Sequence, residues 1–270
     1  MNKNIGFIGT GNMATAIIKG MIDKFDNINK NIFVSDKDIS KVEKISSEFY
    51  INKALDNIDV VKNTDIIILA VKPNIYGIVL EEINEYITKD HIIVSIAAGI
   101  NIDYMEKFFK EPVKIIRTMP NTPVFVGEGM IAITKNKIVS SEELDLVVDI
   151  FSSLGIVDVI DEKLMEIIPA VSASSPAYVY MFIEALADGA VLQGMDRKKA
   201  YKYASQAVLG AAKMVLETGI HPGELKDQVC SPGGTTIEAV YALEKGGFRA
   251  TIIDAMEACT EKAKNIMDKN

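Results

Sequence analysis

The sequence has no tryptophan and only two cysteines and two histidines. Cys230, Cys259, His91 and His221 show none of the spacings that zinc sites use, so we expect no metal centre. Neither histidine has a recognisable nucleophile partner, and no G-x-S-x-G motif is present, which argues against a hydrolase. We expect ordinary packing or capping roles for these four side chains.

Excess positive charge and long apolar runs are also missing. The formal net charge is −8, which argues against binding a nucleic-acid backbone but not against binding a small anion. No apolar run approaches the roughly 20 residues that span a bilayer. Asp and Asn interrupt the start of the chain, unlike a signal peptide. The sequence therefore predicts a cytoplasmic protein that contacts neither nucleic acid nor membrane.

What is present indicates a globular protein with room for two modest domains. The chain has 270 residues, of which 49% are hydrophobic and 24% charged. A glycine-rich stretch lies at its start, between an apolar run at residues 4–8 and a helical pattern at residues 14–22. In a G-x-G-x-x-A loop, the first glycine allows a tight turn and the second lets a pyrophosphate approach the backbone. The stretch predicts a dinucleotide site, although a plain strand-to-helix turn can look similar.

The first half of the chain alternates apolar runs with helical patterns. The runs at residues 31–36, 65–71, 91–96 and 113–117 are typical of strands buried on both faces, which predicts an α/β fold with a Rossmann-type doubly wound parallel sheet. Ligands on such sheets bind outside the carboxyl ends of the strands. Two further edge strands, at 129–134 and 155–159, are expected around a helix. No strand pattern follows Asp161.

The second half reads as an all-α domain. Residues 177–192, 197–217 and 247–267 are alanine-rich and apolar on more than one face, and helices of that kind need partners on several sides. About 110 residues of such helix make a thin core alone, so we expect a homodimer. The predicted domains are residues 1–161, which bind the dinucleotide, and residues 162–270, which bind substrate and dimerise.

A turn at residues 230–236 interrupts these helices. Its hydroxyls and glycines present several amide groups at the start of a helix, an arrangement that suits a carboxylate. An ordinary helix cap is the alternative, but a cap needs only one Ser or Thr. A dinucleotide site together with an anion-binding turn predicts hydride transfer to or from a small carboxylic acid.

Six segments, in this order, resemble the pyrroline-5-carboxylate reductase family: residues 8–14, 70–73, 117–123, 174–178, 221–227 and 231–236. The resemblance extends almost from end to end. It implies an enzyme that reduces the cyclic imine 1-pyrroline-5-carboxylate to L-proline, the last step of proline biosynthesis, with NADPH or NADH as hydride donor. It also implies a Rossmann domain followed by a helical dimerisation domain, whose dimers can join into larger rings.

The resemblance also implies site residues. Thr236 is the catalytic candidate, with its hydroxyl near the ring nitrogen of the substrate. The substrate-binding candidates are Glu162, Ser231, Gly233, Gly234, Thr235 and Thr236. The cofactor-binding candidates, which include the acid at the end of the second strand, are Ile8, Gly9, Thr10, Gly11, Asn12, Met13, Ser35, Asp36, Asn57, Ala70, Val71, Lys72, Pro73, Ala97, Ala98 and Gly99.

One segment departs from the family pattern. Ala173 and Ser175 stand where the family usually has glycine, and an added side chain would shift the loop if either position had positive φ or touched a ligand. A reductase of the same build that acts on another cyclic imine acid is therefore an alternative. A catalytically silent nucleotide sensor or assembly subunit is another, although such a protein would not need the turn at 231–236. The choice between NADH and NADPH stays open.

Overall fold

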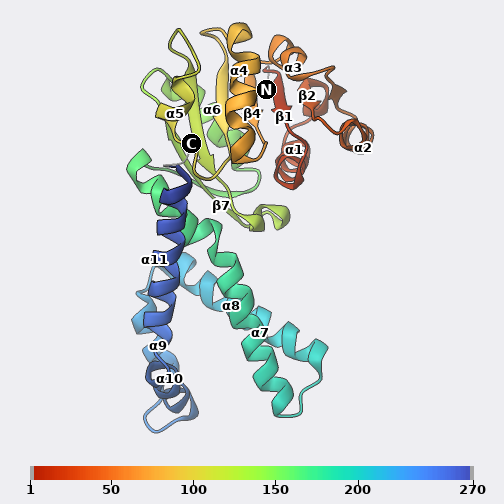
Figure 1. Ribbon diagram of the computed structural model, residues 1–270. Helices are drawn as coiled ribbons and strands as arrows, with labels where there is room; N and C mark the ends of the chain where they lie inside the picture. Colours follow the sequence, from red (N-terminus) through yellow and green to blue (C-terminus); the bar gives the residue numbers. More distant parts are fainter. Residues whose placement is uncertain (1–2, 268–270) are drawn as a thin grey trace. The chain divides into compact units, whose positions relative to one another are not determined.

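The computed structural model describes residues 3–267 and has two compact units (Figure 1). Unit 1 contains the chain as far as Ser174 and again from Cys259, and unit 2 is Ser175–Ala258. The last helix therefore begins in unit 2 and ends in unit 1. The predicted domain boundary at residue 161, where the strand pattern ends, stays a prediction.

Unit 1 is built on an eight-stranded sheet with the order β3-β2-β1-β4-β5-β6-β7-β8. All neighbouring pairs from β3 to β6 are parallel, which confirms the predicted Rossmann-type sheet. Every residue of β1, β4 and β5 is buried, as expected of strands covered on both faces. The strands are β1 Ile5–Ile8, β2 Ile32–Ser35, β3 Asn52–Lys53, β4 Ile66–Leu69, β5 Ile92–Ser95, β6 Lys114–Met119, β7 Gly129–Lys135 and β8 Gly155–Val159.

Two features of the sheet differ from the prediction. β7 is antiparallel to β6 and lies between β6 and β8, so the sheet is mixed and β7 is not an edge strand. The reason is the connection from Met119 to Gly129, which contains only the short 3₁₀ helix Thr122–Val126, whereas a parallel crossover needs a longer segment. The edge strand β3 was not predicted, because two residues give no apolar pattern.

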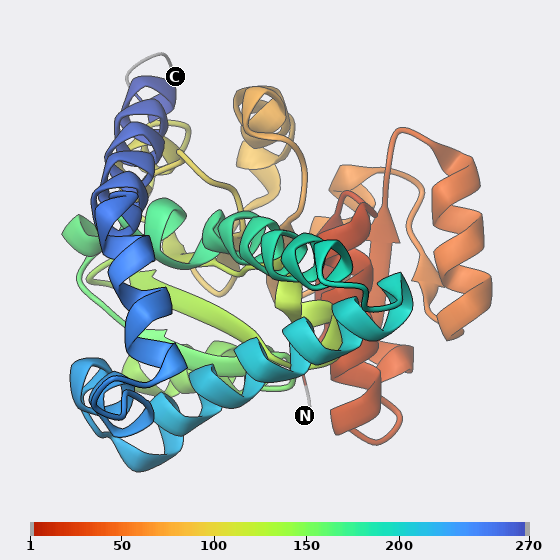
Figure 2. The same cartoon turned by 90° about the horizontal axis from the view of Figure 1, so that it is seen from below.

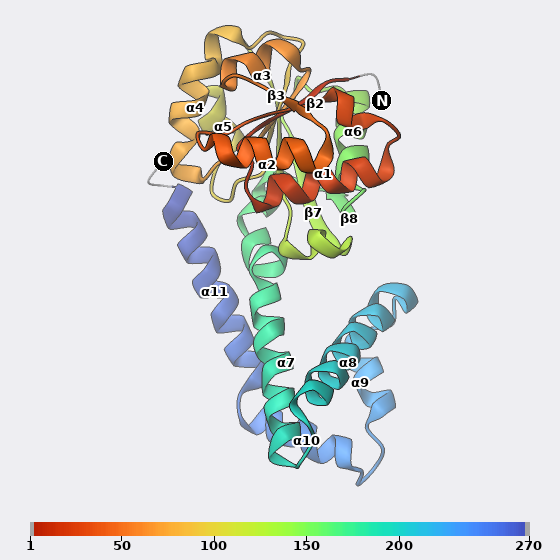
Figure 3. The same ribbon diagram turned by 90° about the vertical axis from the view of Figure 1, so that its right-hand side faces the viewer.

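Six helices cover the two faces of the sheet (Figure 3). Side chains alternate along each strand, so Ile66 and Ile68 join one core cluster while Ile67 and Leu69 join the other. The first cluster includes residues of α1, α2 and α6, and the second includes residues of α3, α4 and α5. These helices are α1 Asn12–Lys24, α2 Ile39–Phe49, α3 Asn57–Asn63, α4 Tyr76–Ile83, α5 Ile102–Glu106 and α6 Ser141–Phe151.

Unit 2 is helical, as predicted, and exposes much of its apolar surface. Its buried apolar side chains are all small: Ala187, Ala200 and Ala204. Tyr180, Met181, Leu192, Tyr203, Leu209, Leu216, Tyr241 and Ile253 are large, apolar and exposed. The helices are α7 Ser175–Leu192, α8 Arg197–Thr218, α9 Pro222–Val229, α10 Thr235–Lys245 and α11 Phe248–Met267, the dark-blue helix of Figure 2.

The segment that departs from the family pattern shows no backbone strain. Residues Pro169–Ala173 form one π-helical turn, and α7 begins at Ser175. Among the described residues, positive φ outside glycine occurs only at Asn27 and Tyr50. Ala173 and Ser175 therefore adopt backbone conformations that any residue tolerates.

Candidate active site

The carboxyl ends of β1, β2, β4, β5 and β6 lie along one edge of the sheet, because these strands are parallel and in register. After β1 the chain passes outward through β2 and β3, and then returns to place β4 on the other side of β1. This reversal makes a topological switch point between β1 and β4, where open α/β sheets bind ligands. The glycine loop leaves β1 at this point.

Gly9 and Gly11 serve different purposes in that loop. Gly9 has φ of +99°, its N–H donates to the Ser35 carbonyl at 2.8 Å, and a Cβ there would lie 2.7 Å from the Ala70 carbonyl oxygen. Gly11 precedes α1, and a Cβ there would meet no described atom within 4 Å. Gly9 is thus required by the protein's own backbone, whereas the space at Gly11 is open to a ligand.

The start of α1 supplies donors to that open space. The first bond of the helix runs from Thr15 N–H to the Gly11 carbonyl at 3.0 Å, so the N–H groups of Asn12, Met13 and Ala14 precede the helical ladder. Gly11 brings no side chain to cap them, and α1 has no acidic residue in its first turn. A phosphate fits such a helix start, because the free N–H groups and the helix dipole both favour negative charge.

Asp36 follows β2 and is held by its neighbours. Its Oδ2 accepts from Thr10 N–H at 2.8 Å and from the Thr10 hydroxyl at 3.0 Å, and its Oδ1 accepts from Asp38 N–H at 3.0 Å. Partial burial raises the pKa of Asp36, but these hydrogen bonds outweigh that effect and the pKa lies below its usual value. Asp36 is therefore ionised at neutral pH.

Ser35 and Asn57, both predicted cofactor residues, lie together beside Asp36. The Ser35 hydroxyl donates to Asn57 Oδ1 at 2.8 Å, and Asn57 Nδ2 donates to the Glu82 carboxylate at 2.7 Å. A cavity of about 340 Å³ opens next to the glycine loop, and its basic side chains are those of Lys41 and Lys44. The cavity and the free amides fit a phosphate-bearing dinucleotide.

A buried hydroxyl network joins the ends of β4 and β5. The Tyr76 hydroxyl donates to the Leu69 carbonyl at 2.7 Å and accepts from the Ser95 hydroxyl at 3.1 Å. Burial holds the pKa of Tyr76 above its usual value, so the hydroxyl stays protonated and can donate. The network fixes the points from which the predicted cofactor segments 70–73 and 97–99 leave the sheet.

Replacing Tyr76 with phenylalanine should test this network. The change leaves two buried groups without their partner, so the free energy of unfolding should fall by about 1–3 kcal/mol. Urea unfolding measures the difference. Tyr50→Phe is the matched control, because that side chain is 82% exposed and should change stability by no more than about 0.5 kcal/mol. Equal stability of the two variants would contradict the assigned role.

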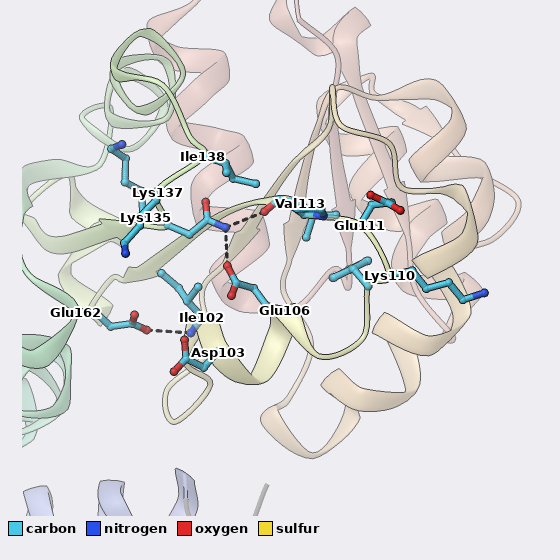
Figure 4. Close-up of a pocket in the computed structure, with 13 residues that line it drawn as sticks. Ile102, Asp103, Glu106, Lys110, Glu111, Val113, Lys135, Lys137, Ile138 and Glu162 are labelled. Carbon is cyan, nitrogen blue, oxygen red and sulfur yellow. Dashed lines mark hydrogen bonds between the residues drawn. The ribbon is translucent and has the colours of Figure 1, made fainter.

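Arg117 and Glu162 form a second anchor (Figure 4 shows Glu162 beside Ile102). The Arg117 side chain is 2% exposed, and its Nη1 lies 3.4 Å from Glu162 Oε1. The same oxygen accepts from Ile102 N–H, the first residue of α5, at 2.9 Å. Burial lowers the pKa of Arg117 and the Glu162 carboxylate raises it in part. Glu162, predicted to bind substrate, is thus engaged with the protein.

The predicted carboxylate turn lies in unit 2. Gly233 has φ of +66°, and Gly234 N–H donates to the Ser231 carbonyl at 3.0 Å, which closes a tight turn before α10. A Cβ at Gly234 would lie 2.3 Å from the Ser231 hydroxyl oxygen. Thr235 and Thr236 are the first two residues of α10, so their N–H groups also precede the helical ladder. The five predicted residues of this turn are brought together.

Two kinds of residue that anchor this region were not singled out from the sequence. Tyr76 and Ser95 gave no signal, because aromatic and small residues are common beside buried strands. Arg117 lies in the middle of a mostly buried strand, and a buried arginine in such a place signals a paired charge. Within residues 3–267, no three His, Cys, Asp or Glu side chains gather as metal ligands do, and no helix is long and apolar enough to cross a membrane.

Comparison with known proteins relates the two halves of the chain to two family models, and nearly the whole chain to one kind of enzyme. Residues 162–266 match the family model described as pyrroline-5-carboxylate reductase dimerisation. Residues 4–99 match the model described as NADP oxidoreductase coenzyme F420-dependent. A pyrroline-5-carboxylate reductase of Escherichia coli is 50% identical over 266 residues, which cover 98% of this chain and 99% of the relative.

Solved structures agree with these matches. A pyrroline-5-carboxylate reductase from Coxiella burnetii is 34% identical with a TM-score of 0.90, and the alignment covers 98% of this chain and 99% of that one. Plasmodium falciparum pyrroline carboxylate reductase, solved with NADP bound, is 37% identical with a TM-score of 0.87 over 98% of each chain.

Proposed function

Because the chain belongs to the pyrroline-5-carboxylate reductase family, we propose that it reduces 1-pyrroline-5-carboxylate to L-proline with NAD(P)H, the last step of proline biosynthesis. The observation that carries the proposal is the extent of the likeness. Half of the residues are identical to the E. coli reductase over 98% of the chain, a span that takes in both the glycine loop and the turn before α10.

We place the cofactor along the edge of the sheet described above. The pyrophosphate would lie over Gly11 and the first amides of α1, where a Cβ would meet open space. The ribose would lie near Asp36, and Ser35 and Asn57 beside it would face the nucleoside. Segments 70–73 and 97–99, which the Tyr76 network anchors, would line the nicotinamide half.

We place the substrate carboxylate on the turn before α10. The N–H groups of Thr235 and Thr236 and the hydroxyl of Ser231 can donate to it, and the start of α10 adds a favourable dipole. The hydroxyl of Thr236 would then reach the ring nitrogen. These roles are inferred from the geometry of the turn and from the family pattern.

The reaction requires little of the protein beyond holding the substrate and the cofactor in the correct orientation. NAD(P)H supplies a hydride when it is bound. A protonated imine already is a good electrophile, and hydride addition at its imine carbon, which becomes C5 of proline, gives the neutral amine without a further proton. The turn therefore has to hold the substrate in one orientation, and the Thr236 hydroxyl has to keep the proton on the ring nitrogen.

A cofactor-oxidation assay tests the proposal. The chain should oxidise NADH or NADPH when 1-pyrroline-5-carboxylate is added, and both cofactors should be run in parallel. A six-membered cyclic imine acid tests the alternative substrate and should react more slowly. Faster turnover of the larger ring would reassign the substrate, and failure to oxidise either cofactor with any imine would support a nucleotide sensor.

Asp36 should influence the choice of cofactor. Its carboxylate can accept from a ribose 2′-hydroxyl but repels a 2′-phosphate, so NADH should be well accepted. Asp36→Ser should shift the ratio of kcat/KM for NADPH to that for NADH upward by roughly tenfold, because removing a repulsion of about 1.4 kcal/mol between like charges, partly screened by solvent, changes the ratio by that factor. Steady-state kinetics with both cofactors measures the ratio.

Asp38→Ser is the control for that change. Asp38 is exposed and caps α2 through Ser40, so its loss removes one nearby negative charge without touching Thr10. The ratio should stay within about twofold of the wild type, as surface charges are well screened. If the ratio of kcat/KM for NADPH to that for NADH is unchanged in Asp36→Ser, Asp36 does not belong to the cofactor site.

The match to a dimerisation model and the exposed apolar side chains of unit 2 support a homo-oligomer. We propose a homodimer as the basic assembly, with rings of dimers as a further step. With its net charge of −8 the chain is not expected to bind nucleic acid. Light scattering at assay concentration should give at least twice the 29.6 kDa of one chain, and a monomer would refute the dimer.

A further inference from the structure

Both ends of the segment that follows β5 lie next to the pair formed by Arg117 and Glu162. The segment leaves the sheet after Ser95, which is the registered neighbour of Arg117 on β6. It ends at Ile102, whose N–H donates to the Glu162 oxygen that also pairs with Arg117. Between these points lie Ala97, Ala98 and Gly99, and Gly99 has φ of +76°.

This anchor places a charged side chain inside a sheet, which is energetically unfavourable. Burying a guanidinium is unfavourable unless its donors are paired, and Arg117 Nε has no partner among the described residues. An apolar residue at this position of β6 would pack without that cost. Packing therefore does not explain the buried charge of Arg117. Its distinctive contact is with Glu162 Oε1, the oxygen that also accepts from Ile102 N–H.

We propose that Arg117 and Glu162 are positioning residues, which set the backbone of residues 97–101 so that it can receive the nicotinamide half of the cofactor. The inference rests on the proposed use of NAD(P)H. It gives Glu162 a different role from the direct substrate contact that the family resemblance implies. The carboxylate acts through the Ile102 amide, and the charge of Arg117 holds the carboxylate in place.

Charge and geometry favour this role over direct substrate contact. Glu162 faces a cavity of about 500 Å³ that Asp103, Asp161 and Glu166 also line. Four carboxylates around one arginine and one lysine make this region unfavourable for the carboxylate of the substrate. The Oε1 atom of Glu162 already accepts two donors.

The experiment measures NADH binding in the absence of imine, by fluorescence titration, and then the KM for the imine. Glu162→Ala removes the acceptor for Ile102 N–H and should weaken NADH binding by about tenfold, which corresponds to about 1.4 kcal/mol. Glu162→Gln keeps an acceptor for Ile102 and should restore part of the affinity. Arg117→Lys keeps the positive charge but replaces the planar guanidinium with a single ammonium group, and should also weaken NADH binding.

Glu166→Ala is the matched control. Glu166 lines the same cavity, and its carboxylate pairs with Lys264 at 3.7 Å on the surface, so NADH affinity should not change. If Glu162→Ala does not fold, the NADH affinities of Glu162→Gln and Arg117→Lys are compared with that of the wild type instead.

Two results would overturn the inference. Unchanged NADH affinity with a raised imine KM would make Glu162 a substrate contact, and unchanged values of both would leave the pair without a role in the site. Failure of the proposed function looks different: the wild-type chain would bind NADH without oxidising it when imine is added. The inference would then be judged on NADH affinity alone.

Discussion

Replacing Gly11 with valine should abolish NAD(P)H binding in a chain that still folds. The position is open, because a Cβ there meets no described atom within 4 Å, and its φ of −73° suits any residue. The branched side chain would instead fill the space above the first amides of α1, where the pyrophosphate is expected. Isothermal titration should show no measurable cofactor binding, and the thermal midpoint should stay close to that of the wild type.

Gly9→Ala provides the contrast. Its Cβ would lie 2.7 Å from a backbone oxygen, and a φ of +99° is strained for any side chain. This variant should lose stability even without cofactor, by about 1–3 kcal/mol for a strained backbone position. Unchanged cofactor affinity in a folded Gly11→Val protein would show that the pyrophosphate lies elsewhere.

Replacing Thr236 with alanine should lower kcat by about 100-fold, at the lower end of what a positioned proton-holding group contributes. NADH affinity without imine should not change, because Thr236 lies at the start of α10 whereas the proposed cofactor residues lie at the carboxyl ends of the strands. Thr236→Ser keeps the hydroxyl and should restore most of the rate. Stopped-flow measurement of cofactor oxidation at saturating substrate gives the comparison.

Thr251→Ala is a suitable control in the same helical unit. The Thr251 hydroxyl donates to the Gly247 carbonyl at 3.1 Å, within its own helix start, so its loss should leave kcat unaltered. A Thr236→Ala variant that keeps its full rate would refute the catalytic assignment, and the turn would then serve binding alone.

Most of the parallel part of the sheet could be predicted because β1, β2, β4 and β5 consist almost entirely of apolar residues. The strand at 129–134 was expected at an edge of the sheet and no direction was assigned to it, although the short connection after Met119 favours antiparallel pairing with β6. Strand direction depends on connection length rather than on the composition of the strand, so a pattern read along one strand cannot supply it. The two residues of β3 could not be predicted, because their pairing depends on the neighbouring β2.

The parts of the candidate site also differ in how far they could be predicted from the sequence. The glycine loop is local, and its chemistry follows from adjacent residues. The anchor between Arg117 and Glu162 joins residues far apart in the sequence, and only the fold brings them within 3.4 Å. The sequence therefore predicts groups that meet a ligand more readily than groups that hold other residues in place.

The reversal of direction at β7 also bears on the order in which the sheet assembles. Met119 pairs with Ala132 across a short connection, whereas Ile5 must find Ile66 to join β1 and β4. Closing the longer loop costs about 1.4 kcal/mol more in chain entropy. The β6–β7 pair should therefore form early, and the β1–β4 contact at the switch point late. The last contact to form during folding would then be the one beside the proposed cofactor site.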